Sequence, residues 1–290
     1  MSNIIFGPIN SRRFGSSLGV DLSPFTKQCN FDCLYCELLP AKTTDKQIST
    51  ILPQNIIKEL KIALLKYPKI DVITFTANGE PTIYPHLDEL MMMVNKIKQK
   101  KKTLILSNGG NIYKKDIQNS LKIFDIVKLS LDCLDENCFR KLDRVDKTVD
   151  TQKIVDGMIS FRKIYHKQLI LETMFVKNIN DKPSHIKSLY NSYKQIKADR
   201  IDISTIDRPP AYDVKPLTYE ELSNIASNFT ALNVTIASKN KNIQQNSYDK
   251  DEIVNLLQKR PLATDDINIL FDENSKQKLQ EETFLSDVPV

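Results

Sequence analysis

The sequence predicts an α/β protein with a parallel sheet and helices packed outside it. Short apolar segments that suit buried strands alternate along the chain with segments whose apolar residues recur at helical spacing. Polar or conformationally special residues follow each strand segment. Because the carboxyl ends of parallel strands meet at one edge of a sheet, this order gathers those residues at the edge where such folds carry their chemistry.

Six segments have the apolar character of buried strands. They cover residues 18–22, 71–76, 103–106, 126–131, 168–176 and 200–205. One helical pattern begins at Pro53 and continues through Ile56, Ile57 and Leu60, since proline suits a first helical turn. Two further helices are expected over 87–97 and 182–196. The alternation therefore predicts six β/α units in series.

The composition changes after residue 216. Thr218 and Glu221 form a capping-box pattern before the next apolar helix face. A possible strand at 233–237, a polar linker at 239–247 and three short helices at 251–260, 264–271 and 274–282 complete the chain. We therefore divide it into a core domain, 1–216, and an acidic, mostly helical C-terminal extension, 217–290.

Charge is distributed unevenly between these two parts. The extension holds 7 Lys or Arg and 12 Asp or Glu, a balance of −5, while the whole chain carries +5. The core is thus basic, which is compatible with an anionic substrate, and the acidic extension is a poor nucleic-acid surface. No apolar run approaches the roughly 20 residues that span a bilayer, so no membrane partner is expected.

Three cysteines at one short spacing are the most informative motif. Cys29, Cys33 and Cys36 form C-x3-C-x2-C in the segment after the first strand. Three thiolates on one loop suit an iron–sulfur cluster with one iron open to a ligand. A structural zinc site is disfavoured because no second C-x2-C pair exists and the chain has 3 histidines. A disulfide with a spare thiol is disfavoured by the low cysteine count.

This cysteine motif, with Tyr35 before the third cysteine, resembles that of the radical S-adenosylmethionine (SAM) superfamily. The resemblance implies a [4Fe-4S] cluster on Cys29, Cys33 and Cys36, and SAM as second cofactor, with Tyr35 in the cofactor site. It also implies a partial (β/α)6 barrel of the TIM type rather than a closed barrel. An oxygen-sensitive cluster and reduced thiols favour a cytoplasmic location.

A second element resembles the superfamily's Gly-Gly-Glu-Pro motif. It is Asn78-Gly79-Glu80-Pro81, directly after the second strand, with Asn78 in place of the first glycine. In relatives this backbone holds the amino group of SAM. Glycine lets a backbone approach a ligand closely, and proline fixes the turn that follows.

Further elements resemble motifs that face SAM in relatives. Ser107 and Asn108 resemble the Thr-Asn-Gly element after the third strand, and Ser130 and Asp132 resemble a Ser-Leu-Asp strand end. The resemblance implies that they face the ribose and methionine parts of SAM, whose hydroxyls suit such partners. Arg144 lies where relatives often carry a basic residue, which implies contact with the SAM carboxylate.

Taken together, these resemblances imply reductive cleavage of SAM to a 5′-deoxyadenosyl radical that modifies a substrate. A low-potential electron donor such as flavodoxin or ferredoxin is the implied partner. The sequence identifies no catalytic side chain. Cys133 and Cys138 are too few for a second cluster and are expected as small residues in a packed layer.

The opening run, residues 7–21, and Arg208-Pro209-Pro210 resemble a subgroup of Fe–S oxidoreductases related to the enzymes of wyosine-base synthesis in tRNA. A tRNA base is therefore one expected substrate, with Arg12, Arg13, Arg144 and Arg208 as candidate phosphate contacts. Modification of a peptide or small metabolite is an alternative, as is a non-catalytic Fe–S protein for electron transfer or storage. The SAM-side motifs count against the last of these.

Overall fold

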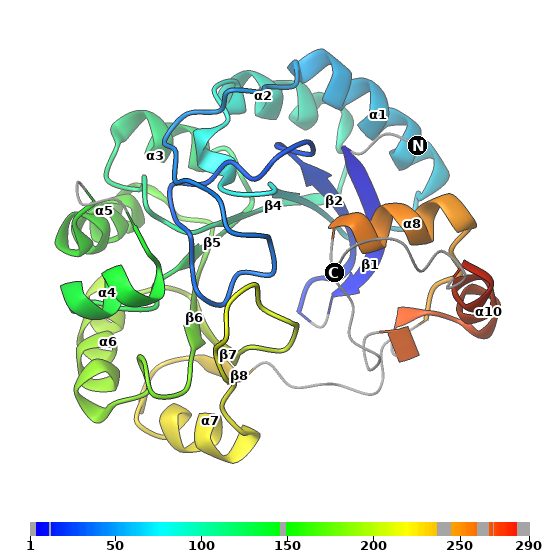
Figure 1. Cartoon of the computed structure of the whole chain (residues 1–290). Coiled ribbons are helices and arrows are strands. Elements are labelled where there is room, and N and C mark those ends of the chain that lie inside the picture. The colour runs from blue at the N-terminus through cyan, green and yellow to red at the C-terminus, as the bar shows by residue number, and fades with distance from the viewer. Residues whose placement is uncertain are drawn as a thin grey trace.

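The computed structural model describes residues 4–11, 13–145, 149–236, 245–259, 267–268 and 270–282. Eight strands form one sheet in sequence order, with β1 antiparallel to β2 and every later pair parallel. The sheet curves into an open barrel whose outer side carries the helices (Figure 1). The strands are β1 Ile5–Ser11, β2 Gly15–Asp21, β3 Val72–Thr76, β4 Lys102–Ser107, β5 Ile126–Ser130, β6 Gln168–Phe175, β7 Arg200–Thr205 and β8 Val234–Ile236.

Most of the helices cover the outer face of the sheet and are amphipathic in the way the sequence predicts. Ile56, Ile57 and Leu60 of the first helix are buried, and Pro53 occupies its first turn. The reciprocal hydrogen bonds of the Thr218–Glu221 capping box are both present. The helices are α1 Pro53–Lys66, η1 Pro81–Ile83, α2 Leu87–Ile97, α3 Lys115–Leu121, α4 Glu136–Leu142, α5 Thr151–Ile164, α6 Pro183–Ile196, α7 Tyr219–Ala226, α8 Lys250–Lys259 and α10 Glu273–Glu282.

The α/β prediction of a partial barrel with a helical C-terminal segment is confirmed, with two strands added. All six expected strands are present, with ends shifted by at most three residues, and the strand at 200–205 has the expected bounds. β1 was not expected as a strand, and the candidate at 233–237 is β8, which pairs with β7. The expected linker at 239–247 and helix at 264–271 lie mostly outside the described residues.

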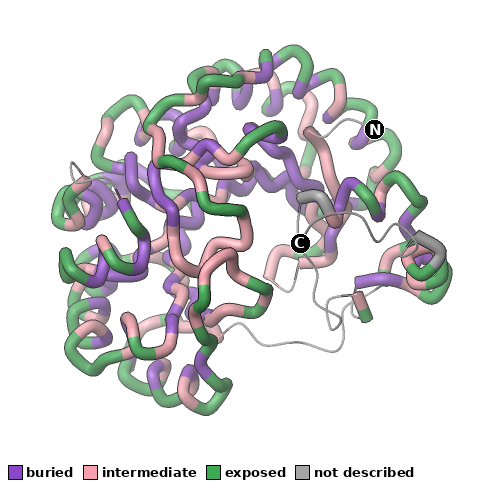
Figure 2. The backbone as a smooth tube through the Cα atoms, viewed as in Figure 1, coloured by how far each residue is buried: buried purple, intermediate pink, exposed green. Residues whose placement is uncertain are grey.

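The two faces of the strands differ in character. Outward residues such as Ile73, Val127 and Leu171 are buried against the helices in the main core. Inward-facing residues near the amino ends of the strands form a small apolar cluster at the bottom of the barrel. Phe14 packs against this cluster, which contains Val72, Leu104, Ile126 and Ile170. Because side chains alternate along a strand, Lys128, Glu172 and Asp202 point inward, above that cluster. Buried strand positions and exposed outer helix surfaces are distinguished in Figure 2.

The C-terminal segment packs beside β1. Its apolar residues form a second core with Ile9 of β1. Side-chain donors of Asn246, Tyr248 and Asn255 bind carbonyl oxygens of β1 at 3.1, 2.8 and 3.0 Å. Helix α8 therefore lies against the β1 edge of the sheet, and α10 packs against α8 (Figure 1). In the part of the chain that the structure describes, no helix is long and apolar enough to cross a membrane.

Candidate cofactor site at the carboxyl ends of the strands

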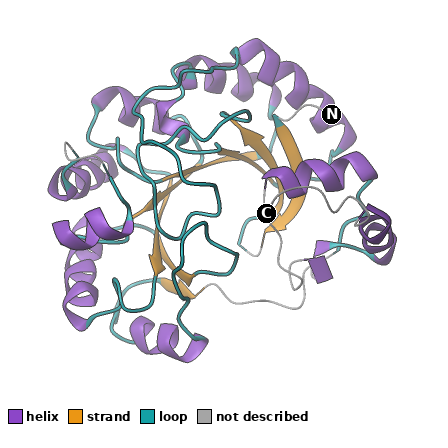
Figure 3. Ribbon diagram, in the orientation of Figure 1, coloured by secondary structure: helices purple, strands orange, loops and turns teal. Residues whose placement is uncertain are grey.

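The long loop between β2 and α1 carries the three cysteines across the open end of the barrel (Figure 3). Cys29, Cys33 and Cys36 are partly buried free thiols. They line one cavity of about 190 Å³. Burial raises the pKa of each thiol, and the pKa of Cys29 reaches about 12 with a further contribution from Glu80. Among the described residues, no three His, Cys, Asp or Glu side chains are grouped closely enough for a single metal ion.

The cysteine loop is joined to the Asn78–Pro81 turn by backbone pairing. The Gln28 N–H donates to the Asn78 carbonyl, and the Glu80 N–H donates to the Gln28 carbonyl, both at 2.9 Å. Gly79 lies between these bonds at φ +136°, and a Cβ there would come within 1.8 Å of the Gln28 carbonyl oxygen. Only glycine allows this approach, which explains the residue in the motif.

Asp32 anchors the middle of the cysteine loop. Its carboxylate accepts from Lys27 Nζ at 2.7 Å, from Arg144 Nε at 3.2 Å and from the Tyr212 hydroxyl. Burial opposes ionisation, but the Lys27 and Tyr212 hydrogen bonds outweigh it and hold the pKa of Asp32 below its ordinary value. Arg144 also stacks on Tyr212, 4.8 Å from the ring centre. The structure thus uses Arg144 to brace the loop; its contact with SAM stays a prediction.

Backbone contacts hold the same loop from two sides. The N–H groups of Asp32 and Leu34 donate to carbonyls at the end of α4, at 3.1 and 2.8 Å. On the other side, Ala211 N–H donates to the Cys36 carbonyl at 2.8 Å, and Arg208 pairs with Glu37. The loop after β7 and the end of α4 therefore fix the cysteines between them.

Glu80 organises the turns after β3 and β4. Its carboxylate accepts from Thr82 N–H and hydroxyl, at 2.9 and 2.6 Å, and from the Ser107 hydroxyl at 2.7 Å. The second oxygen accepts from Asn108 N–H at 2.8 Å. Burial raises the pKa of Glu80, although these hydrogen bonds oppose the rise. Asn108 Nδ2 in turn lies 3.6 Å from the Cys29 sulfur.

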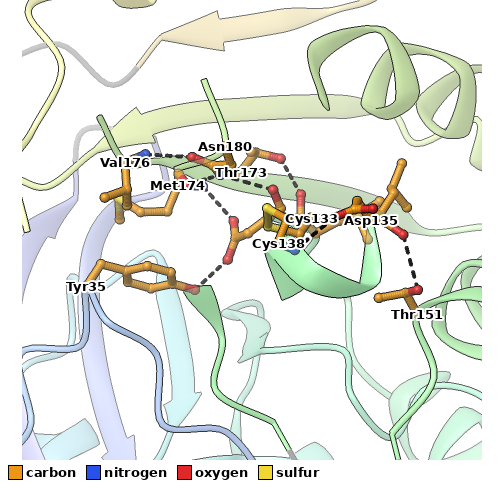
Figure 4. The surroundings of a disulfide bond; sticks show 12 residues. Tyr35, Cys133, Asp135, Cys138, Thr151, Thr173, Met174, Val176 and Asn180 are labelled. Atoms are coloured by element: carbon orange, nitrogen blue, oxygen red, sulfur yellow. Dashed lines mark hydrogen bonds between the residues drawn. A yellow bond between two sulfur atoms is a disulfide. The ribbon is translucent and has the colours of Figure 1, made fainter. Parts of the chain in front are cut away.

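Asp132, two residues after the end of β5, connects the cysteine loop to β6. It accepts from the Tyr35 hydroxyl and, at 2.7 Å, from Met174 N–H (Figure 4). Burial raises the pKa of Asp132 to about 7, although both hydrogen bonds oppose the rise. Burial likewise raises the pKa of Tyr35 well above its ordinary value. The pair positions the Tyr35 ring at the cavity wall.

Cys133 and Cys138 are joined by a disulfide (Figure 4). Both are buried, as expected for residues of a packed layer. The expectation that they are reduced thiols is wrong for this structure. The bond links the segment after β5 to α4, the helix whose last carbonyls hold the cysteine loop. The two cysteines are 5 positions apart in the sequence, and the folded turn into α4 brings them together.

The cavity brings together most of the predicted cofactor residues. The three cysteines share its wall with Tyr35, Gly79, Glu80, Ser107, Asn108 and Ser130. Four predicted residues do not line the cavity. Asp132 lies behind Tyr35, and Asn78 contributes backbone groups to the pairing with Gln28. Pro81 is the first residue of η1, and Arg144 lies outside the cavity wall. Sequence reasoning missed Leu106, Lys128 and Glu172, which also line the cavity. The inward alternation of β5 and β6 is the signal that could have identified the two charged residues.

Comparison with known proteins assigns the chain to a family. Residues 23–189 match the model of the radical SAM superfamily. The chain belongs to the radical SAM superfamily. It is 41% identical over 281 residues to the UPF0026 protein of Helicobacter pylori strain J99, covering 96% of this chain and 91% of that protein. The GTP 3′,8-cyclase of Helicobacter pylori is 33% identical over 160 residues, 54% of this chain and 46% of that enzyme.

Solved structures of radical SAM proteins share the fold. TYW1 with a lysine-pyruvate adduct bound superposes with a TM-score of 0.57 at 17% identity, covering 73% of this chain and 72% of that one. SuiB of Streptococcus suis bound to SAM gives a TM-score of 0.57 at 18% identity, covering 75% and 49%. Radical SAM proteins use a [4Fe-4S] cluster, SAM and a reductant. The chain is a radical SAM enzyme.

Proposed function

We propose that Cys29, Cys33 and Cys36 hold the [4Fe-4S] cluster and that the adjoining cavity wall binds SAM. The observation that carries the proposal is the shared cavity: three free thiols face the same space as the Gly79–Glu80 turn and Asn108. Thiolates are the ligands of such clusters, so the donor set fits. Because burial keeps the thiols protonated, binding iron would displace a proton from each.

The chain's own residues then position and shield the cofactors. Gly79 permits close backbone approach, and Glu80 holds the Ser107 and Asn108 turn rigid from within the protein. The Tyr35–Asp132 pair fixes an aromatic ring beside the third cysteine. When bound, the cluster and SAM supply an electron and a 5′-deoxyadenosyl radical. We also propose that a flavodoxin or ferredoxin donates the electron and that the protein is cytoplasmic.

A tRNA base is the first candidate substrate. It is supported by the basic core and by the resemblance of residues 7–21 to the wyosine-related subgroup. The expected phosphate contacts contribute little support. Arg13 points into the barrel and pairs with Asp202, and Arg208 pairs with Glu37. Arg12 lies outside the described residues.

A small metabolite is the second candidate, and a specific observation favours it. Charged side chains, Lys128 and Glu172, line the cavity inside the barrel, where a small polar molecule can reach them. The sequence similarity to GTP 3′,8-cyclases, over about half of this chain, extends the comparison to enzymes named for a small substrate. A non-catalytic role in storage or electron transfer does not agree with membership of an enzyme family.

Anaerobic reconstitution followed by dithionite reduction with SAM tests the proposal. We expect about four irons per chain and slow release of 5′-deoxyadenosine, measured by mass spectrometry. Absence of 5′-deoxyadenosine from an iron-loaded sample would refute the catalytic assignment. For the substrate, a gel-shift series across salt concentrations with tRNA should show salt-dependent binding if RNA is bound. Salt-insensitive or absent binding favours the small-metabolite candidate.

A further inference from the structure

A layer of charged side chains crosses the inside of the barrel below the cysteine cavity. Asp202 of β7, fully buried, accepts hydrogen bonds from Arg13 at 2.9 Å and from Arg200 at 2.8 Å, and forms an ion pair with Lys128 at 3.2 Å. Glu172 of β6 lies 2.6 Å from Lys128 and 3.5 Å from Arg13. None of these residues belongs to the motifs assigned to the cluster or to SAM.

The charges in this layer do not balance. Arg13, Lys128 and Arg200 are three cations, and Asp202 and Glu172 are two anions. In addition, Arg13 Nη2 is buried without a hydrogen-bond partner among the described residues. A buried donor without a partner costs free energy, so the layer lacks one acceptor and one negative charge.

The two carboxylates play different parts. Asp202 has 0% of its side chain exposed and is held by three cations. Glu172 is 29% exposed and lies on the cavity wall with Lys128. Asp202 is therefore a fixed counter-ion, whereas Glu172 can leave Lys128 for the cavity. Each of the two carboxylates lies within 3.5 Å of both a Lys128 nitrogen and an Arg13 nitrogen. The two cations are therefore close enough for one oxyanion group to contact them together.

We propose that Lys128, with Arg13 behind it, forms a substrate subsite for an oxyanion, a carboxylate or a phosphate, and that Glu172 occupies this subsite until the substrate displaces it. The inference rests on the proposed function, because the cavity is then where the substrate meets the cofactors. It deepens that function by naming an anionic substrate whose charged group enters the barrel. Charge-assisted hydrogen bonds from Lys and Arg supply the recognition.

Opposite effects of two substitutions test the subsite. Anaerobic holoenzyme with SAM is titrated with inorganic phosphate and with ¹³C-acetate, and binding is followed by ³¹P and ¹³C NMR line broadening. Lys128→Gln should weaken anion binding by at least about tenfold, as for loss of one charge-assisted hydrogen bond. Glu172→Gln should tighten it several-fold, because the competing charge is gone. Lys128→Arg keeps the cation and should restore binding if Lys128→Gln merely distorts the fold.

Lys98→Gln is the matched control. Lys98 precedes β4 and forms an ion pair with Asp125, which precedes β5, so this pair lies at the amino ends of the strands, away from the cysteine cavity. Lys98→Gln should leave anion binding unchanged. The anion that binds more tightly identifies the carboxylate or the phosphate source. No saturable binding of either anion, an unchanged affinity in Glu172→Gln, or equal losses in Lys98→Gln and Lys128→Gln would each overturn the subsite. Each sample is also assayed for 5′-deoxyadenosine, so a sample that forms this product but binds neither anion refutes the subsite alone.

Discussion

Replacing Gly79 by Ala should disconnect the cysteine loop from the turn after β3. In the structure a Cβ at Gly79 would lie 1.8 Å from the Gln28 carbonyl oxygen and 2.4 Å from its carbon, whereas real Cβ contacts stay beyond 3.0 Å. Gln28 would therefore have to withdraw by roughly 1.2 Å. Because backbone atoms make this contact, no side-chain rotation can relieve it.

The cost follows from what this withdrawal breaks. Both hydrogen bonds between Gln28 and the turn are 2.9 Å long and would be lost, each at about 0.5–1.5 kcal/mol net. The φ of +136° adds about 1–3 kcal/mol for a residue with a Cβ. The total is about 2–6 kcal/mol, concentrated at the cysteine loop.

The assay compares iron content after anaerobic reconstitution, SAM affinity by equilibrium dialysis and the thermal unfolding midpoint. We expect Gly79→Ala to lower all three. Gly15→Ala is the matched control, because Gly15 also has a positive φ but the three atoms nearest to a Cβ there belong to the side chain of Asp71, before β3. It should lower the unfolding midpoint alone. Wild-type iron content and SAM affinity in Gly79→Ala would show that the loop–turn pairing does not support the site.

Three further predictions concern single side chains. Cys33→Ala should reduce iron well below the wild-type content in an iron assay, whereas Cys133→Ala should retain it; equal loss in both would contradict the ligand assignment. Glu80→Gln turns a carboxylate oxygen into a donor facing N–H or O–H donors such as Asn108 N–H, so SAM affinity should fall by about 1–3 kcal/mol in dialysis while iron is retained. Burial opposes ionisation of Asp125, but hydrogen bonds, foremost from Lys98, keep its pKa below the ordinary value. Its charge therefore stabilises the fold above about pH 3.9 and stops doing so as the pH falls through the lower folded pKa. The free-energy difference between wild type and Asp125→Asn in urea unfolding should shrink over that range, and a constant difference would refute the assignment.

The placement of the motifs was predictable because it depends on order alone. Each motif follows a strand, and parallel strands end at one edge, so the sequence brings Cys29, Gly79 and Asn108 together without coordinates. β1 was missed because its sequence contains Gly7 and Pro8, which are typical of turns. Proline lacks an N–H to donate, which an edge strand tolerates.

The inner face of the barrel was harder to predict. Lys128 lies between apolar neighbours in a strand buried on both sides. Alternation along the strand separates its face from that of Val127, but only the register of the sheet shows which face is the inner one. The partner of Arg144 is Asp32, 112 residues earlier in the chain. No local pattern reports such a distant contact, and the resemblance assigned Arg144 to SAM. Side-chain contacts of this kind can be identified only from the folded structure.

The side chains that Asn246, Tyr248 and Asn255 direct at β1 determine how the sheet can meet other molecules. A partial barrel has a free edge strand, and such an edge normally invites a strand from another chain. Here carbonyls of Ile5 and Pro8 already have donors from the C-terminal segment. A second copy could add a strand to β1 only by first detaching α8. The C-terminal segment therefore occupies the β1 edge of the sheet, and pairing of another strand with this edge requires its displacement.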